Sequence, residues 1–572
     1  MRVRFVVPVG LAALVSVAPL RVAGASRGPV HPARPAAATG HLAAPVRSVP
    51  GSGRLVRADF NGDGFADLAV GVPFEGVGPV PDAGAVNALY GTTAGLQADA
   101  PDDQVWIQGA NGLDDKAERS DHFGWSLAAG DFNGDGFADL AVGTPHEDVL
   151  LEDGSATIAD AGSVSVIYGS ASGLQTAAPA DQFWSQESPG LIGLAEHRDW
   201  FGWSLVSGDF NRDGFADLAV GVRGEDDGPE SIPRGGAVNT IYGSAAGLQS
   251  NGNQHIDQDW PGMQDQAEAG DQFGSSLASA DFNGDGFDDL AIGVPFEDVG
   301  SIRDAGAVQV MFGTAGGLQA DSPDDQFWSQ GSNGLQDAAE ADDDFGFSLA
   351  AADFNGDGFG DLAVGVVKED VGTVVDAGAI QVLYGSAGGL QASNPDDQFL
   401  AQGSGGLQDS AETGDWFGAA LTAGDFNGDG FDDVAVAVPN EDVGSVTDAG
   451  AVQVIYGSSA GLEADGMGGP DDQFWSQDSP GVLDSAETSD GFGHAVFGAD
   501  FNGDGTADLA VGVPAEDGRR VDIGMVNVLY GSSTGGLQAF GIGGPDDQAW
   551  TQDSPGVQNT AEPDDNFGWS VG

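Results

Sequence analysis

The stretch DFNGDGFADLAVG occupies residues 59–71, and the same thirteen letters return at residues 131–143. Close variants of the phrase begin at five further aspartates, which are Asp209, Asp281, Asp353, Asp425 and Asp500. The steps between the seven starts are 72, 78, 72, 72, 72 and 75 residues. A regular period of this size predicts a solenoid, a propeller or another array of like units.

Each repeat contains the same order of short apolar runs. In residues 345–402 these runs are FGFSLAAADF, DLAVGVV, AIQVLYGS and DQFLAQ, and the acidic segment KEDVGTVVDAG separates the second from the third. The runs are rich in Val, Leu, Ile, Phe and Tyr and are bounded by Gly, Asp or Asn, which is typical of strands. No helical periodicity is sustained along the array. We therefore predict an all-β fold, a seven-bladed β-propeller of four-stranded blades.

The composition narrows the class of function. The chain has 572 residues with 89 acidic and 18 basic side chains, a formal net charge of −71. Such a surface repels phosphates and anionic lipid headgroups, so no nucleic-acid partner is expected. Hydrophobic residues make up 41% of the chain and lie in strand-like runs, which argues against a disordered acidic protein. The absence of cysteine excludes disulfides, thiolate metal sites and cysteine nucleophiles.

The N-terminus has the features of an export signal. MRVR is basic, residues 5–20 are apolar, and AGA at residues 23–25 offers small residues for cleavage. An uncleaved membrane anchor is the alternative. We expect a signal peptide at residues 1–25, a disordered Pro/Ala-rich linker at 26–51 and the propeller at 52–572. The mature chain is then secreted and has no transmembrane segment.

The repeated phrase has the pattern D-x-N-x-D-G-x-x-D, with oxygen side chains at positions 1, 3, 5 and 9. The glycine at position 6 permits a sharp turn. Hard oxygen ligands with this alternation suit Ca²⁺, and a backbone carbonyl at position 7 completes the shell; Mg²⁺ prefers fewer protein ligands and retained waters. The alternative is an Asx-rich turn that binds nothing. Three carboxylates in nine residues repel each other unless a cation lies among them, which favours calcium.

About seven calcium sites are therefore predicted, one in each loop. The expected ligands, with position 7 acting through its carbonyl, are Asp59, Asn61, Asp63, Phe65 and Asp67; Asp131, Asn133, Asp135, Phe137 and Asp139; Asp209, Asn211, Asp213, Phe215 and Asp217; Asp281, Asn283, Asp285, Phe287 and Asp289; Asp353, Asn355, Asp357, Phe359 and Asp361; Asp425, Asn427, Asp429, Phe431 and Asp433; and Asp500, Asn502, Asp504, Thr506 and Asp508. Arg212 replaces the glycine of position 4, and Thr506 the phenylalanine of position 7. Neither change removes an expected ligand.

The unit FGWSLAAGDFNGDGFADLAVGTP at residues 123–145 resembles the FG-GAP repeat of the integrin α-subunit N-terminal β-propeller. The GAP half reads GVP at residues 71–73, 293–295 and 512–514 and drifts elsewhere. The resemblance covers about residues 52–572. It implies Ca²⁺ between the first two strands of each blade, although family propellers often carry the loop in only some blades. It also implies an adhesion or recognition module that binds an extracellular protein or glycan.

A secreted hydrolase or lectin on the same scaffold is the alternative function. A phospholipase acting on glycosylphosphatidylinositol anchors also carries FG-GAP repeats, beside a separate catalytic domain for which this chain leaves no stretch. GSSAG (457–461) and GWSVG (568–572) match G-x-S-x-G but lack the strand–turn–helix context of that motif. The seven histidines form no metal-binding spacing. We therefore predict no catalytic residues and favour binding over catalysis.

Two further features recur along the chain. An A-E-x-x-D-x-F-G motif precedes every blade after the first, and its carboxylate pairs are Glu118/Asp121, Glu196/Asp199, Glu268/Asp271, Glu340/Asp343, Glu412/Asp415, Glu487/Asp490 and Glu562/Asp565. Such a pair could be a general acid and base. Its repetition favours a structural device, either a turn bond or an extra calcium ligand. The tryptophan of DQ-x-W recurs at positions 106, 184, 328, 475 and 550, and we expect it to pack between blades rather than to stack on sugars.

Two irregular stretches carry additional expectations. RGEDDGPESIPRGG at residues 223–236 departs most from the repeat, so the third unit is where we expect specificity to lie. Residues 567–572 read as the start of a fresh unit. We expect them to pack near the first unit and to complete, or compete with, its innermost strand. A truncated fragment of a longer array is the alternative.

Overall fold

The structure is a computed structural model that describes residues 58–99, 103–151, 154–226, 232–321, 323–332, 334–393, 395–464, 471–540 and 545–572. The expected signal peptide and linker lie outside these residues. The described residues all belong to one compact unit, Thr39–Gly572, and their regular elements are short strands. In this part of the chain no helix has the length and apolar character needed to cross a membrane.

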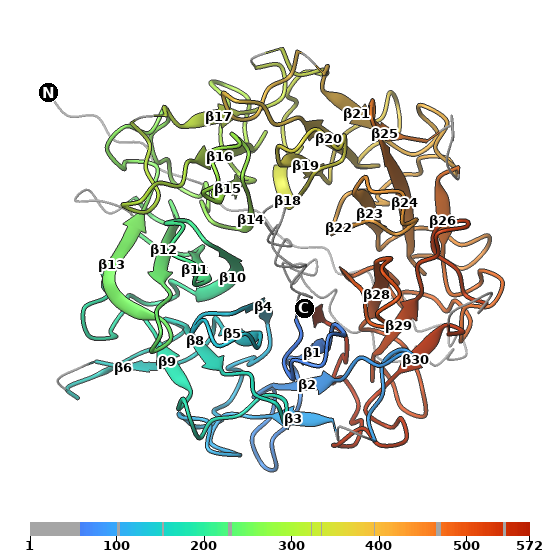
Figure 1. Cartoon of the computed structure of the whole chain (residues 1–572). Coiled ribbons are helices and arrows are strands. Elements are labelled where there is room, and N and C mark those ends of the chain that lie inside the picture. Colours follow the sequence, from blue (N-terminus) through green and yellow to red (C-terminus); the bar gives the residue numbers. More distant parts are fainter. Residues whose placement is uncertain are drawn as a thin grey trace, which may run out of the picture. The chain divides into compact units, whose positions relative to one another are not determined.

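Seven antiparallel sheets of four main strands follow one another along the chain and form the blades (Figure 1). In the order of each sheet, the strands are β31 (Ser570–Val571), β1 (Leu68–Val72), β2 (Ala85–Leu89) and β3 (Gln104–Trp106) in the first blade; β4 (Ser126–Gly130), β5 (Asp139–Thr144), β8 (Ser163–Ile167) and β9 (Gln182–Trp184) in the second; β10 (Phe201–Gly208), β11 (Asp217–Val222), β12 (Ala237–Tyr242) and β13 (Gln249–Ile256) in the third; β14 (Ser276–Ala280), β15 (Asp289–Val294), β16 (Ala307–Met311) and β17 (Gln326–Trp328) in the fourth; β18 (Phe345–Ala352), β19 (Asp361–Val366), β20 (Ala379–Leu383) and β21 (Gln398–Leu400) in the fifth; β22 (Leu421–Gly424), β23 (Asp433–Val438), β24 (Ala451–Ser458) and β26 (Gln473–Trp475) in the sixth; and β27 (Ala495–Ala499), β28 (Asp508–Val513), β29 (Met525–Leu529) and β30 (Gln548–Trp550) in the seventh.

Two short pairings extend this plan. β6 (Val149–Leu150) and β7 (Thr157–Ile158) form a hairpin in the second unit, and β25 (Gly461–Glu463) pairs with β24 in the sixth. The first strands of neighbouring blades lie next to the centre and contact one another around the ring, including β31 with both β27 and β4. The prediction of an all-β seven-bladed propeller is therefore confirmed.

The C-terminal segment supplies the innermost strand of the first blade. Val571 lies opposite Val70 and Ser570 opposite Gly71 in an antiparallel pair. The backbones of Gly572 and Ala69 exchange hydrogen bonds of 2.8 and 3.0 Å. The expectation that residues 567–572 complete the first unit is thus confirmed. Closing the ring in this way removes the exposed edge that an open sheet would leave for pairing with another chain.

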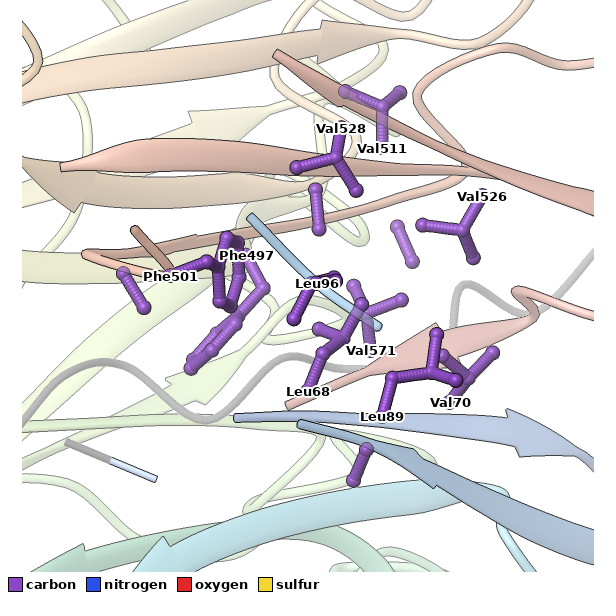
Figure 2. Packing of buried hydrophobic residues seen from close by; sticks show 14 of the residues in the cluster. Leu68, Val70, Leu89, Leu96, Phe497, Phe501, Val511, Val526, Val528 and Val571 are labelled. Carbon is purple, nitrogen blue, oxygen red and sulfur yellow. The ribbon is translucent and has the colours of Figure 1, made fainter. Parts of the chain in front are cut away.

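The blades are held together by apolar side chains from both faces of their sheets. In the cluster between the first and seventh blades, Val571 and Leu68 lie beside Leu96, near Phe497 of the seventh blade (Figure 2). The second strand of every blade is buried along its whole length, because each of its faces packs against a neighbouring blade. Such strands read as continuous apolar runs rather than alternating ones. This is why DLAVGV recurs without a polar interruption.

The two halves of the repeat motif meet across the blade junction. A Cβ atom on Gly71 would come within 2.2 Å of the carbonyl oxygen of Gly124, the glycine of the next Phe-Gly pair. Gly124 itself has a φ of 91°, which favours glycine. The same close approach occurs at five further junctions, at Gly143, Gly221, Gly293, Gly365 and Gly512. The glycines of the motif therefore set the spacing between successive blades.

The recurring tryptophans of DQ-x-W lie on the outermost strands and pack inward. Trp106, Trp184 and Trp328 are buried members of the apolar clusters, and Trp475 and Trp550 pack half-buried against the largest of them. The prediction that these rings pack in the core is confirmed.

Candidate functional site

Each D-x-N-x-D-G-x-x-D loop leads into the second strand of its blade and is folded by its own oxygen atoms. In the second blade, Asp131 Oδ1 accepts hydrogen bonds from the backbone N–H groups of Gly134 (2.7 Å) and Asp135 (3.1 Å), and Oδ2 accepts one from Gly136 (2.9 Å). Asn133 Oδ1 accepts from the N–H of Asp135 at 2.8 Å, and Asp135 Oδ1 accepts from Phe137 at 3.1 Å. The first, third and fifth residues therefore shape the turn.

The aspartate at position 9 is held from two directions. Asp139 is fully buried, and its Oδ2 accepts the N–H of Phe132 while its Oδ1 accepts the N–H of Gly169, each at 2.9 Å. Both bonds recur in every blade, at Asp67, Asp217, Asp289, Asp361, Asp433 and Asp508. Gly169 follows β8, so the carboxylate ties the loop to the third strand of its blade.

The buried aspartate at position 9 has a raised pKa. The pKa of Asp139 is raised to about 8, mainly by burial and also by the charges of Asp131 and Asp135, while the two backbone hydrogen bonds oppose the shift. Burial is also the main cause that raises the pKa of Asp131. Three carboxyl groups within electrostatic reach of one another ionise together only when a cation offsets their repulsion. A cation among these carboxyl groups would offset the repulsion that helps to raise the pKa of the buried aspartate.

The seven loops are joined to one another in a closed ring. The backbone carbonyl of Asp59 accepts the N–H of Ala138 in the next loop at 3.0 Å. The equivalent bond joins every successive pair of loops, and the N–H of Ala66 returns to the carbonyl of Asp500 at 3.0 Å. The seven loops therefore form one continuous hydrogen-bonded ring.

The two loops with unusual residues keep their internal bonds. Arg212 takes the position of a glycine with a φ of 56°, and its Nη1 donates to the carbonyl of Asp285 in the fourth loop at 2.8 Å. Its guanidinium lies 5.8 Å from the ring of Phe287. In the seventh loop, Thr506 Oγ1 donates to Asp504 Oδ1 at 2.5 Å. Both changes add contacts and leave the oxygen side chains of the loops in place.

The chemistry of the loops fits calcium. Each loop offers only oxygen donors, and carboxylate, amide and carbonyl oxygens are the ligands that Ca²⁺ takes in proteins. Across the described residues, however, no three His, Asp or Glu side chains are grouped so that they could hold a metal ion as they stand. The loop carboxylates face backbone N–H groups instead. Each ionised carboxylate has about four acceptor directions, so these bonds leave lone pairs for an ion. The calcium ligands remain predictions.

The A-E-x-x-D-x-F-G motif forms a turn bond. Asp121 Oδ2 accepts a short hydrogen bond from the backbone N–H of Glu118, and the same bond occurs in all seven copies. The prediction of a structural device is confirmed in this form. A repeated backbone contact of this kind explains the motif without general acid–base chemistry.

Beside each of these turns lies a buried glutamate that sequence reasoning missed. Glu147 accepts a hydrogen bond of 2.7 Å from Gln108 Nε2 of the preceding blade. Burial and the charges of Asp115 and Asp121 raise the pKa of Glu147. The bond recurs at every blade junction, as Gln186–Glu225, Gln258–Glu297, Gln330–Glu369, Gln402–Glu441, Gln477–Glu516 and Gln552–Glu75. Within the chain the partners are 39 residues apart in six of the seven pairs, and this fixed separation is a signal that the sequence carries.

The end of the propeller opposite the loops is built from side chains that differ between blades. The residue after Phe-Gly lies within two residues of the start of each innermost strand. From the first blade to the seventh it is Trp569, Trp125, Trp203, Ser275, Phe347, Ala419 and His494. β10 shows the geometry, since it begins at Phe201 beside Trp203 and ends at Gly208, directly before the Asp209 loop. The loops and these residues therefore occupy opposite ends of the inner strands.

Comparison with known proteins agrees with this arrangement. The FG-GAP repeat family matches residues 54–86, 123–167, 201–239, 273–311, 345–383, 417–455 and 492–529. The chain is an FG-GAP repeat protein. Its seven matched segments each include the calcium-type loop and the strand that follows it.

The relatives of this FG-GAP repeat protein are distant. Phosphatidylinositol-glycan-specific phospholipase D of Bos taurus is 35% identical over 164 residues, which are 29% of this chain and 18% of that protein. Integrin alpha-PS2 of Drosophila melanogaster is 28% identical over 285 residues, 48% of this chain and 17% of that protein. The matched region is thus about a fifth of each relative. Among solved structures, rhamnogalacturonan lyase YesW is 12% identical with a TM-score of 0.30, covering 93% of this chain and 98% of that one.

Proposed function

We propose that this FG-GAP repeat protein is a secreted, calcium-loaded recognition or adhesion module. The observation that carries the proposal is the closed ring of seven loops, each with three carboxyl groups, one of which belongs to a buried aspartate with a raised pKa. The seven loops place a large negative charge at one end of the propeller, and bound cations would offset it. The similarity to integrin α subunits supports recognition as the task of the frame.

In the second blade the ion would be held by the side chains of Asp131, Asn133, Asp135 and Asp139 and by the carbonyl oxygen of Phe137. Bound calcium would supply positive charge that offsets the repulsion among the three carboxylates. The loop's own side chains hold its shape. Asp131 fixes the turn by accepting hydrogen bonds from three backbone N–H groups, and Asp139 anchors the turn to the blade. Because neighbouring loops share backbone hydrogen bonds, occupancy of one site favours the shape that the next requires.

Calcium titration by calorimetry, combined with a binding screen against glycans and cell surfaces, tests the proposal. We expect about seven equivalents of Ca²⁺ to bind, and we expect surface binding that is lost in excess chelator and restored by Ca²⁺. Asp357→Ala should lower the stoichiometry by about one, whereas Asp396→Ala, a change to an exposed aspartate outside the loops, should not. Absence of calcium binding, or surface binding that is unaffected by chelator, would contradict it.

A secreted hydrolase or lectin on the same scaffold is the second candidate, and the similarity to phosphatidylinositol-glycan-specific phospholipase D is the observation that favours it. The similarity extends over 18% of that enzyme, so its activity does not transfer with it. Turnover of a glycosylphosphatidylinositol-anchored substrate by the purified chain, lost on a single side-chain change, would favour the enzyme.

A further inference from the structure

An extended group of aromatic rings occupies the end of the propeller opposite the loops. Trp125 is central, with its ring centroid 5.0 Å from that of Trp203 and 5.3 Å from that of Trp569. These three tryptophans begin the innermost strands of the second, third and first blades, and β31, β4 and β10 lie side by side around the centre (Figure 1). The three rings are almost fully buried, with 5 or 6% exposure.

A second layer of half-buried rings covers the first. The rings of His122 and His146 have centroids 4.8 Å apart, and His146 lies 6.1 Å from Trp200. The Nδ1 atoms of the two histidines are 3.1 Å apart. Burial lowers the pKa of both histidines, and that of His122 falls to about 3, so the pair is neutral at physiological pH. We call the rings of Trp125, Trp200, Trp203, Trp569, His122 and His146 the aromatic face.

Two arginines from the irregular third unit lie on this face. The guanidinium carbon of Arg223 is 4.4 Å from the ring of Trp203 and 5.8 Å from that of Phe296. That of Arg234 is 5.3 Å from the ring of Trp200. Both residues belong to the stretch 223–236 that departs most from the repeat. The unit expected to carry specificity therefore brings two of its three arginines to the aromatic face.

Arg223 donates a hydrogen bond to the neutral side chain of Gln272, and neither arginine is held by a carboxylate of the described residues. Among the described residues, no ion pair within 4.0 Å joins Arg223 or Arg234 to an acidic side chain, although acids outnumber bases 89 to 18 in the chain. Burial lowers the pKa of Arg223 to about 10, the charge of Arg234 lowers it further, and Asp344 opposes the shift. Arg223 is half-buried and Arg234 is exposed, and two cations that repel each other are stabilised by an anion placed between them.

Donor groups on the same face are also without partners. The indole Nε1 atoms of Trp125, Trp200 and Trp569 are buried and form no hydrogen bond to any described residue. A buried indole N–H normally has an acceptor, since leaving it unpaired costs free energy. The face therefore has aromatic surface and positive charge in excess. A ligand that matches it carries carboxylate or hydroxyl oxygens on a ring with an apolar side.

We propose that the aromatic face with Arg223 and Arg234 binds an acidic saccharide, a glycan that carries uronic-acid or similarly carboxylated sugars. The carboxylate lies against the two guanidinium groups, which bind planar oxyanions bidentately. The sugar ring stacks on the half-buried ring of Trp200, which lies beside the exposed Arg234. This assignment rests on the proposed recognition function and specifies its site and ligand class.

Other classes of ligand fit the aromatic face and its two arginines less well. A neutral glycan would leave both guanidinium groups without an anion. An acidic peptide could reach the arginines, and it is therefore an arm of the test.

The experiment measures binding of a hexamer of galacturonic acid to the full chain by calorimetry at fixed calcium. The methyl-esterified hexamer serves as the uncharged ligand and a hexamer of glutamate as the peptide. We expect the galacturonate hexamer to bind at least tenfold more tightly than either. Arg223→Gln and Arg234→Gln should each weaken its binding by about 10- to 100-fold, the effect of losing a charge-assisted hydrogen bond. Arg520→Gln, an exposed site on the seventh blade with the same change of charge, should bind as the unmodified protein does.

Several outcomes would overturn the assignment. These are no binding of the galacturonate hexamer, equal binding of its methyl ester, equal binding of the glutamate hexamer, or unchanged binding by both arginine variants. Arg234 is exposed, so Arg234→Gln keeps the test valid if Arg223→Gln fails to fold. Calcium stoichiometry is measured on the same samples. Intact calcium binding without saccharide binding refutes the assignment alone, whereas loss of both points to failure of the proposed function.

Discussion

The two ends of the inner strands differ in how closely their side chains repeat from blade to blade. At the loop end, seven blades repeat the same oxygen side chains, the same buried aspartate and the same backbone bond to the next loop. At the other end, the residue after Phe-Gly is tryptophan in three blades and serine, phenylalanine, alanine or histidine in the rest. Repetition suits a frame, because every junction must have the same geometry for the ring to close. Variation suits recognition, because a ligand without sevenfold symmetry needs side chains that differ from blade to blade.

The largest expected effect comes from removing calcium from the loop end. Extracellular calcium sites have dissociation constants of roughly 10⁻⁴ to 10⁻³ M. At ~1 mM calcium and the tighter limit, each site contributes about 1.4 kcal/mol by mass action, so seven contribute about 10 kcal/mol. We expect a large fall in melting temperature in excess chelator, full recovery with Ca²⁺ and little with Mg²⁺. Scanning calorimetry measures this, and an unchanged melting temperature in chelator would mean that the loops are metal-free turns.

The sequence predicts the blades and their loops, but it does not predict which side chains of neighbouring blades contact one another. The blades, their number and the closing strand follow from local patterns, because each strand is a short apolar run between turn residues. The turn bond of Glu118 and Asp121 is local as well. The Gln108–Glu147 bond and the stacking of Arg223 on Trp203 depend on which blade and which end a side chain reaches. A repeat pattern shows that Gln and Glu recur, but it does not show that they face each other.

The second prediction distinguishes the two kinds of aspartate within one loop. Asp361 accepts three backbone N–H groups, from Phe354, Asn355 and Gly385, in a fully buried site. Asp361→Ala leaves these donors unpaired and should cost at least about 2–6 kcal/mol of unfolding free energy, with or without calcium. Asp357 accepts only the N–H of Phe359. Asp357→Ala should cost about 1.4 kcal/mol in millimolar calcium and almost nothing in chelator.

Urea denaturation of both variants, with and without chelator, measures the difference. Asp396→Ala is the control outside the loop, and its unfolding free energy should match that of the unmodified chain. Equal losses for Asp357→Ala in the two buffers would show that this residue supports the turn and binds no ion.

The third prediction concerns pH and the blade junctions. Burial raises the pKa of Glu516 to about 7, the hydrogen bond from Gln477 lowers it, and the charges of Asp484, Asp490 and Glu487 raise it. A raised carboxyl pKa stabilises the fold fully below the unfolded value near 4.5, and this contribution is lost as pH rises through about 7. Because the other junction glutamates shift in the same direction, the chelated protein should be more stable at pH 5 than at pH 8.

Glu516→Gln imitates the protonated side chain and tests this sign. Its unfolding free energy should decrease less between pH 5 and pH 7 than that of the unmodified chain, by up to about 1.4 kcal/mol per pH unit for the one proton removed. Glu412→Gln, at an exposed glutamate, should keep the original slope. A slope that Glu516→Gln does not change would mean that this glutamate is ionised throughout the range.

The smallest effect on stability is expected for Arg212, which replaces the glycine at position 4 of the third loop. Arg212 adopts a φ of 56° at a position that is glycine in the other loops, and a left-handed conformation costs a non-glycine residue about 1–2 kcal/mol. Arg212→Gly removes this cost together with an exposed hydrogen bond to Asp285, so the unfolding free energy should change by less than about 1 kcal/mol.

The Arg212→Gly variant also removes a positive charge from the edge of the fourth loop, where that charge competes with a cation. Calcium affinity should therefore rise by a few-fold at one or two sites, with unchanged stoichiometry and unchanged binding at the aromatic face. Calorimetric titration at low ionic strength measures the shift, because salt screens such interactions. A loss of calcium affinity in Arg212→Gly would instead assign Arg212 to holding the fourth loop in its binding shape.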